Sequence, residues 1–126
     1  MIEIKAIETI EDLNQVGKCW NKAPRSDGDF YNTFKAGKRL VLCAFDESKP
    51  VGTVSLVFER EDRDIANGSE IAEINAFQII PDYRGAGLSS KLLNQLIQVA
   101  KNRKIKKLTL GVEKQNKLAC EIYLHW

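Results

Sequence analysis

The segment IIPDYRGAGLSS, residues 79–90, joins an apolar β-type stretch to a long helical pattern. Pro81 ends the strand, and a turn with Gly85 and Gly87 leads at once into apolar residues at helical spacing that begin at Leu88. Glycines let the backbone curl close to a ligand that a β-carbon would push away. The first N–H groups of the helix point out of its N-terminus, where the dipole adds roughly half a positive charge. The segment therefore predicts a cradle for phosphate, most plainly for a pyrophosphate.

Two common phosphate cradles fit this segment badly. The chain has no GxxxxGK[ST], which argues against a P-loop. A dinucleotide fold would place GxGxxG after the first strand, whereas here the glycines come late and the third one is missing. Taken alone, a Gly-Ala-Gly turn is as often structural as functional, so its surroundings must decide.

Working outward from this segment, the hydrophobic periodicity predicts a single mixed α/β domain over residues 1–126, built round a central sheet. Its order is β-α-α-β-β-β-α-β-α. The expected elements are a strand at 2–6, a helix at 10–20 with Thr9 as N-cap, a short helix at 29–35 ended by Gly37, strands at 39–45, 51–58 and 71–80, the helix from 88, a short buried strand at 108–112, and a last helix from 116 to the terminus.

Composition excludes several classes of protein. Hydrophobic residues at 44% and charged residues at 29% argue against disorder, and 19 basic against 17 acidic side chains is too even to favour nucleic acid as the main partner. No apolar run reaches the ~20 residues of a membrane span. The N-terminus alternates apolar and polar residues like a strand rather than a signal peptide, so we expect a cytoplasmic protein. Three widely spaced cysteines without CxxC predict neither a disulfide framework nor a zinc site.

The motif from Arg84 to Ser89 resembles the R/Q-x-x-G-x-G/A signature of the GCN5-related N-acetyltransferases (GNAT), with Ser89 in place of the final small residue. Upstream, residues 77–83 (FQIIPDY) are similar to that family's fourth strand and its connection to the helix. Downstream, residues 116–123 (NKLACEIY) resemble its N-x-x-A-x-x-x-Y helix. Element order agrees as well, so the resemblance covers essentially the whole chain.

The resemblance implies the acyl-CoA N-acyltransferase fold and direct transfer of an acetyl group from acetyl-CoA to a primary amine of a small molecule or a protein. It implies no metal and no covalent enzyme intermediate. Backbone groups of Phe77, Gln78 and Ile79 would pair with the pantetheine arm as an added strand, and the N–H near Phe77 would polarise the thioester carbonyl. The residues whose backbone N–H groups would hold the pyrophosphate are Arg84, Gly85, Ala86, Gly87, Leu88, Ser89 and Ser90.

Three side chains receive further roles from the resemblance. Asn116 would steady the pantetheine or the last helix, and Tyr123 would be the general acid that protonates the departing thiolate. Glu73, on the same strand six residues before Ile79, is the candidate base. Glu73 and Asn75 share a strand face, so they could hold an ordered water between them. The alternatives are a Tyr123 ring in the core and a solvated Glu73 carboxylate.

The family pattern breaks at the C-terminus. After the tyrosine helix the family continues with two more strands, whereas here the sequence stops at Trp126. We therefore expect the strand at 108–112 to keep an unpaired edge. Three accounts stay open: a truncated product, a homodimer in which a second copy covers the edge, and a domain that binds CoA without a competent acceptor site. The alternatives to an enzyme are accordingly a non-catalytic acyl-CoA-binding domain and a purely structural domain, which would leave Gly85 and Gly87 unexplained.

Overall fold

The computed structural model describes residues 2–19, 28–85, 87–110 and 121–123, which form a six-stranded sheet with three α-helices. The strands stand in the sheet in chain order: β1 (Ile2–Ile7), β2 (Arg39–Asp46), β3 (Lys49–Val57), β4 (Ile71–Ile79), β5 (Lys107–Leu110) and β6 (Glu121–Tyr123). All neighbours run antiparallel except β4 and β5, which are parallel. The helices are α1 (Ile10–Cys19), α2 (Asp29–Lys35) and α3 (Leu88–Asn102), and a short 3₁₀ turn, η1 (Pro81–Tyr83), precedes α3.

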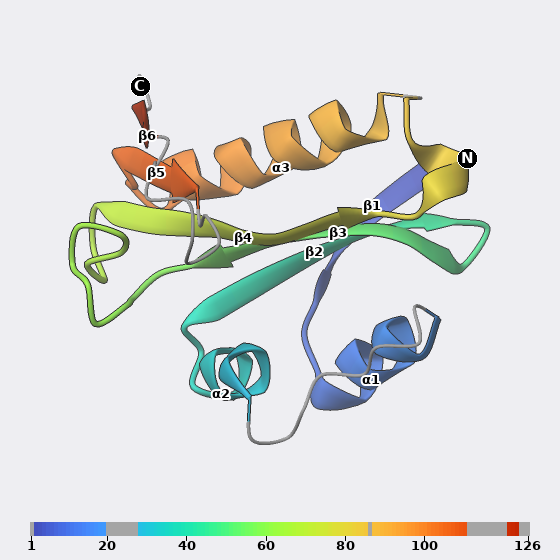
Figure 1. The fold of residues 1–126 in the computed structure, drawn as a ribbon, viewed down its shortest axis with the longest axis horizontal. Helices are drawn as coiled ribbons and strands as arrows, with labels where there is room; N and C mark the ends of the chain where they lie inside the picture. Colours follow the sequence, from blue (N-terminus) through green and yellow to red (C-terminus); the bar gives the residue numbers. More distant parts are fainter. Residues whose placement is uncertain (1, 20–27, 86, 111–120, 124–126) are drawn as a thin grey trace.

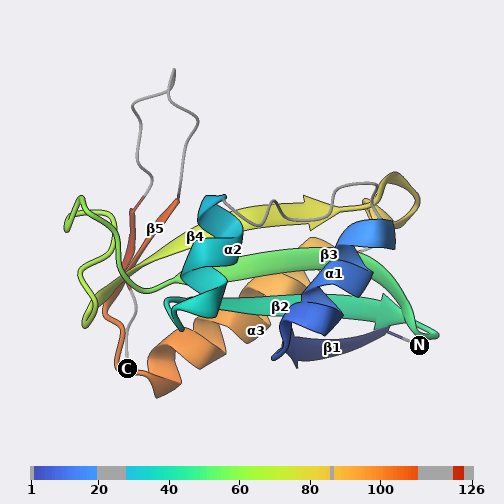
Figure 2. The ribbon, with the colours of Figure 1, turned by 90° about the horizontal axis from the view of Figure 1, so that it is seen from below.

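The sheet lies between two layers of helix. Helix α3 covers one face, and α1 and α2 cover the other, as Figures 1 and 2 show from two directions. The buried stripe of α3 comprises Leu88, Leu92, Leu96 and Ala100, and it packs on apolar residues of β2, β3 and β4. A smaller core lies under α1. None of the helices in the described ranges is long and apolar enough to cross a membrane.

Local signals placed most elements where the sequence predicts them. Thr9 caps α1, since its Oγ1 accepts the N–H of Asp12 at 3.1 Å. Gly37 ends α2 with a φ of +75°, a left-handed conformation that suits glycine. The strands at 2–7, 39–46, 49–57 and 71–79 differ from their predicted bounds by only one or two residues.

The prediction of a C-terminal helix is wrong for residues 121–123, which form β6. This strand pairs antiparallel with β5, Lys107 lying opposite Tyr123, so the expected unpaired edge of β5 is covered. The physical reason is that an edge strand presents a row of unsatisfied N–H and C=O groups, and a neighbouring β-prone segment satisfies them. The rest of the expected helix, 116–120, lies outside the described residues.

The α3 stripe generates a prediction about stability. Leu92 is fully buried between α3 and the sheet, whereas Gln95, one turn on, is exposed. Leu92→Ala should lower the free energy of unfolding by about 2–5 kcal/mol, since it removes buried methyl groups and leaves a cavity. Gln95→Ala should change it by less than about 0.5 kcal/mol. Urea denaturation measures both, and equal effects would contradict this placement of the core.

Candidate active site

A β-bulge interrupts β4 close to its C-terminal end. Ser55 of β3 stands opposite Asn75, but Thr53 stands opposite Gln78, so Ala76 and Phe77 together face a single residue of β3. Ala76 has a φ of +51°, which is uncommon for a residue with a side chain. Such a bulge bends its strand and re-aims the residues that follow.

The bulge changes which side chains reach which face of the sheet. Before it, Ile74 points into the core under α3, and Glu73 lies on the opposite face. In a regular strand Phe77 and Ile79 would share the face of Glu73. Instead, Ile79 packs against the core under α3, and both residues line a cavity with Ser89 of α3. The extra residue therefore moves the end of β4 to the α3 side.

One edge of β4 opens at the same point. Strand β5 pairs with β4 only from Ile71 to Ile74, and among the described residues no strand pairs with residues 75–79 on that side. On the other side these residues stay in register with β3, Gly52 lying opposite Ile79. The backbone of β4 thus offers an unoccupied edge for an extended ligand, as a sheet edge does for a peptide.

The glycine turn, Gly85 and Gly87, follows this open edge. Both glycines have a φ of +81°, and a β-carbon on either would meet no atom within 4 Å. Gly87 is the N-cap of α3 and makes no side-chain cap. The first helical bond runs from the N–H of Lys91 to the carbonyl of Gly87, so the N–H groups of residues 88–90 precede the hydrogen-bonded helix.

The charge at this end of α3 also suits an anion. The first turn of α3 carries no acidic side chain, in contrast to α1, whose first turn has Glu11 and Asp12. Acidic side chains in the first turn interact favourably with the positive end of a helix dipole and so partly neutralise it. The start of α3 therefore keeps both its dipole and its N–H donors for a ligand.

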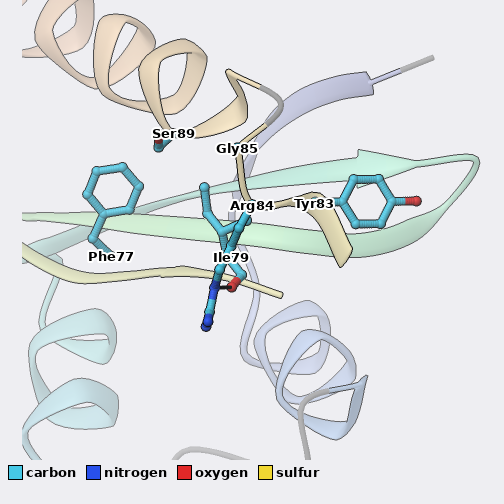
Figure 3. A pocket seen from close by; sticks show the side chains of 6 residues that line it. All are labelled: Phe77, Ile79, Tyr83, Arg84, Gly85 and Ser89. Atoms are coloured by element: carbon cyan, nitrogen blue, oxygen red, sulfur yellow. Dashed lines mark hydrogen bonds between the residues drawn. The ribbon is translucent and has the colours of Figure 1, made fainter. Parts of the chain in front are cut away.

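A cavity of about 300 Å³ connects the open strand edge to the glycine turn. Its lining comprises Phe77, Ile79, Tyr83, Arg84, Gly85 and Ser89, shown in Figure 3. Phe77 lies under the first turn of α3 on the same side as Ser89, and Tyr83 points away from both. Phe77 is the large hydrophobic side chain exposed among the described residues, at 38%, and its ring lines this cavity.

Two side-chain contacts hold the turn in place. The Nε–H of Arg84 donates to the carbonyl oxygen of Ile79 at 3.0 Å. The hydroxyl of Tyr83 donates to Oδ2 of Asp46, which ties η1 to the end of β2. This hydrogen bond lowers the pKa of Asp46 and raises the pKa of Tyr83.

Glu73 and Asn75 are each held by an arginine. Its Oε1 accepts the Nε–H of Arg60 at 2.8 Å, and Arg60 also reaches Oδ1 of Asp29 at 2.7 Å. Asn75 is held by another arginine, Arg39, whose Nη1–H donates to Oδ1 of Asn75 at 2.9 Å. We call these five residues the arginine network. An ordered water between Glu73 and Asn75 stays a prediction.

The arginine network joins α2 to β4. Arg39 is 1% exposed in its side chain and pairs with Asp29 at 3.3 Å, and its guanidinium lies 4.2 Å from the centre of the Phe30 ring. Burial lowers the pKa of Arg39 to about 10, against the attraction of Asp29, so the guanidinium stays charged at neutral pH. Each carboxylate oxygen of Asp29 accepts a hydrogen bond from one arginine, Oδ2 from Arg39 and Oδ1 from Arg60. In the arginine network the two arginine charges are therefore matched by the charges of Asp29 and Glu73.

The other predicted site residues divide into three groups. Residues 77, 79, 84, 85 and 89 line the cavity, whereas Gln78 falls on the opposite face of the sheet beside Thr53. Leu88 and Ser90 lie in the first turn of α3, and the Leu88 side chain is buried in the core. Ala86 and Asn116 lie outside the described residues.

Tyr123 is not brought to the glycine turn. Its backbone in β6 lies opposite Lys107, which in turn lies opposite Ile71 at the start of β4. The glycine turn follows the other end of β4, eight residues or about 26 Å along the strand. The acid role of Tyr123 thus stays a prediction from the motif.

Sequence reasoning missed the bulge and Arg39. A bulge leaves no reliable mark in one sequence, and Ala76 is an ordinary residue for a strand. The sequence did contain a sign that Arg39 is buried, because this charged residue stands at the start of the apolar run LVLCAF. A buried charge needs partners, so its position could have prompted a search for them.

The contact between Tyr83 and Asp46 generates a prediction. Because the hydroxyl of Tyr83 stabilises the ionised carboxylate, Tyr83→Phe should raise the pKa of Asp46 toward its ordinary value. A carboxyl-carbon NMR titration measures this directly. Tyr31→Phe, in α2, is the matched control and should leave the titration of Asp46 unchanged. An unaltered Asp46 in the Tyr83 variant would show that the turn is not held by this bond.

Comparison with known proteins places this geometry in a family. Residues 5–125 match the model of the Acetyltransferase (GNAT) family. An uncharacterized N-acetyltransferase of Methanocaldococcus jannaschii is 41% identical over 133 aligned positions, which cover 91% of this chain and 55% of that protein. The chain therefore spans about half the length of this curated relative.

Solved structures agree with this fold. A predicted acetyltransferase from Clostridium acetobutylicum, solved with acetyl-CoA, superposes with a TM-score of 0.64 at 17% identity, covering 93% of this chain and 84% of that one. A ribosomal-protein-alanine N-acetyltransferase from Brucella melitensis superposes with a TM-score of 0.67 at 19% identity, covering 90% and 82%. Since the family model matches nearly the whole sequence, the chain belongs to the GNAT acetyltransferase family.

Proposed function

We propose that this chain is an acetyl-CoA-dependent N-acetyltransferase domain that transfers the acetyl group to a primary amine of a small molecule or a peptide. Membership of the family supports the reaction class, and the name of the Methanocaldococcus jannaschii relative agrees with it. Acetyl-CoA as the donor is also consistent with the ligand of the Clostridium acetobutylicum structure.

The observation that carries the proposal is the pairing of an open strand edge with an uncapped helix N-terminus. The pantetheine arm of acetyl-CoA is an extended chain of amides, which suits the free edge of β4 at residues 77–79. Its pyrophosphate suits the N–H groups of the glycine turn and the first turn of α3. The cavity beside Phe77 and Ser89 lies between the two. One ligand with an extended arm and an anionic end fits this arrangement.

The proposed chemistry is a direct acyl transfer. The amine nitrogen forms a bond to the carbonyl carbon of the thioester, the carbon–sulfur bond breaks, the nitrogen loses a proton, and the thiolate gains one. The N–H of Phe77 supports the negative charge on the carbonyl oxygen, as an oxyanion donor does. Glu73 is the proposed proton acceptor through Oε2, because Oε1 is bound to Arg60. Its carboxylate lies on the sheet face opposite the cavity, so the proposal requires the amine to approach from the α2 side of β4.

A domain that binds acyl-CoA without turnover is the second candidate. The observation in its favour is the strand β6, which holds the backbone of Tyr123 at the start of β4 rather than beside the cavity. The backbone of Tyr123 thus lies away from the cavity, and the tyrosine among the lining residues is Tyr83. Binding and turnover are therefore tested separately.

Acetyl-CoA should stabilise the folded chain. A ligand at about 100 times its Kd that binds only the folded state adds about 2.7 kcal/mol, which a thermal unfolding scan detects as a raised Tm. Gly87→Asp should abolish this shift, because it places a negative side chain at the anion site. Gly37→Asp is the matched control: Gly37 also has a positive φ and open space around it, so the backbone strain is similar, but it lies at the end of α2.

Two results would contradict the proposed binding site. A cooperative transition of the unchanged protein with no shift in acetyl-CoA would show that the glycine turn does not hold the ligand. A shift that survives in Gly87→Asp would place acetyl-CoA elsewhere. If Gly37→Asp also loses the shift, the loss in Gly87→Asp is due to backbone strain and not to a charge at the anion site.

Turnover separates the two candidate functions. If Tyr123 is the acid, Tyr123→Phe should lower amine-dependent release of CoA by roughly 10²-fold or more and leave the acetyl-CoA thermal shift unchanged. A thiol-reactive dye reports the release, with a panel of polyamine, aminoglycoside and lysine-peptide acceptors. Full activity in Tyr123→Phe would remove Tyr123 from the mechanism and agree with its placement in β6.

A further inference from the structure

The bulge residues sit beside the buried guanidinium of Arg39. Asn75 is the last residue before the left-handed Ala76, and its side-chain oxygen accepts a hydrogen bond from Arg39 at 2.9 Å. Because a guanidinium has donors only, this bond fixes which end of the Asn75 amide faces Arg39. The guanidinium is itself fixed, since its Nε–H donates to Oγ1 of Thr33 at 2.8 Å and Nη2 pairs with Asp29.

A second side chain on the same face reaches the bulge. The hydroxyl of Thr53 donates to the carbonyl oxygen of Ala76 over a long 3.4 Å. Ser55, the strand partner of Asn75, does not compete for the Asn75 amide, since its buried hydroxyl makes no hydrogen bond among the described residues. Arg39 is thus the charged group on which the conformation of Asn75 depends.

The direction of the Phe77 N–H follows from Asn75 and Ala76, because this N–H lies in the same peptide plane as the Ala76 carbonyl. A left-handed residue rotates the next peptide plane away from the direction that a regular strand would give it. Left-handed backbone at a residue with a β-carbon persists only where the surroundings hold it. Arg39 provides such a support through Asn75, on the sheet face opposite the cavity.

We propose that Arg39 is a positioning residue of the acetyltransfer site: its buried guanidinium, acting through Asn75, holds the bulge of β4 so that the N–H of Phe77 faces the thioester carbonyl. This inference rests on the proposed function. It assigns to the arginine network a task beyond joining α2 to β4, because Asn75 belongs to the strand that carries the oxyanion donor.

The test changes the partners of Arg39 and leaves Arg39 in place, because removal of a buried guanidinium destabilises a protein for reasons unrelated to the bulge. Asn75→Ala removes the accepting oxygen. Asn75→Asp keeps an oxygen for the guanidinium and is the conservative rescue. Asn102→Ala is the matched control, since Asn102 is an exposed asparagine at the end of α3 whose side-chain oxygen accepts from Gln98 and not from Arg39.

The readout is the backbone amide NMR signals of the full chain, titrated with acetyl-CoA and, separately, with CoA. In the unchanged protein the amides of Gly85 and Gly87 should move with both ligands, and the amide of Phe77 should move more with acetyl-CoA, which alone carries the carbonyl. In Asn75→Ala the extra response of Phe77 should fall at least twofold, while the glycine amides respond as before. Asn75→Asp and Asn102→Ala should resemble the unchanged protein.

Each outcome decides one of the two proposals. If the glycine amides do not respond in the unchanged protein, the proposed function fails, and the role of Arg39 fails with it. If the glycines respond but Phe77 does not distinguish the ligands, or responds equally in Asn75→Ala, the proposed function stands and the role of Arg39 is overturned. With an accepted amine, kcat should fall in Asn75→Ala by about tenfold or more, toward the 10²–10³-fold cost of losing an oxyanion donor.

Discussion

The bulge in β4 is the constraint on which the rest of the site depends. One extra residue at Ala76 and Phe77 moves Phe77 and Ile79 to the face under α3, where the glycine turn begins. Without it, these side chains would face α2, and the cavity would lose two of its six lining residues. The left-handed Ala76 costs roughly 1–3 kcal/mol, so the neighbouring strands must hold it. The fold meets this cost by ladder pairing on both sides of the bulge, with Ser55 before it and Gly52 after it.

The two layers of helix perform different tasks. Helix α3 contributes the large core and directs an uncapped N-terminus at the end of β4, so packing and the anion site come from the same element. Helix α2 has no fully buried residue: Phe30 and Phe34 pack partly buried against the smaller core, and Arg39 contacts Asp29 and Thr33. Arg39 is buried while its partner Asp29 is 60% exposed, so the pair contributes little to stability but fixes geometry, because a buried guanidinium is costly to leave without partners.

Much of the fold could be predicted because the informative signals are local. Thr9 marks the start of α1, Gly37 marks the end of α2, and the apolar stripe from Leu88 marks α3. Each signal depends on hydrogen bonds or burial within a few residues of itself. The helix expected at residues 121–123 failed because the competing interaction, pairing with β5, is made by a strand distant in sequence. Helical spacing in a short segment does not outweigh a satisfied sheet edge.

The sequence by itself determined the turn from residues 79 to 90, its two glycines and the start of α3. The proposed anion site depends on these local features, because the helix dipole, the glycine conformation and the free N–H groups are consequences of local backbone structure. The motif in this turn also indicated the GNAT family. Only the tertiary structure decided that Glu73 pairs with Arg60, that Asn75 pairs with Arg39, and that the end of β4 changes face. Those facts arise from contacts between residues more than ten positions apart and from one inserted strand residue, neither of which leaves a periodic mark in the sequence.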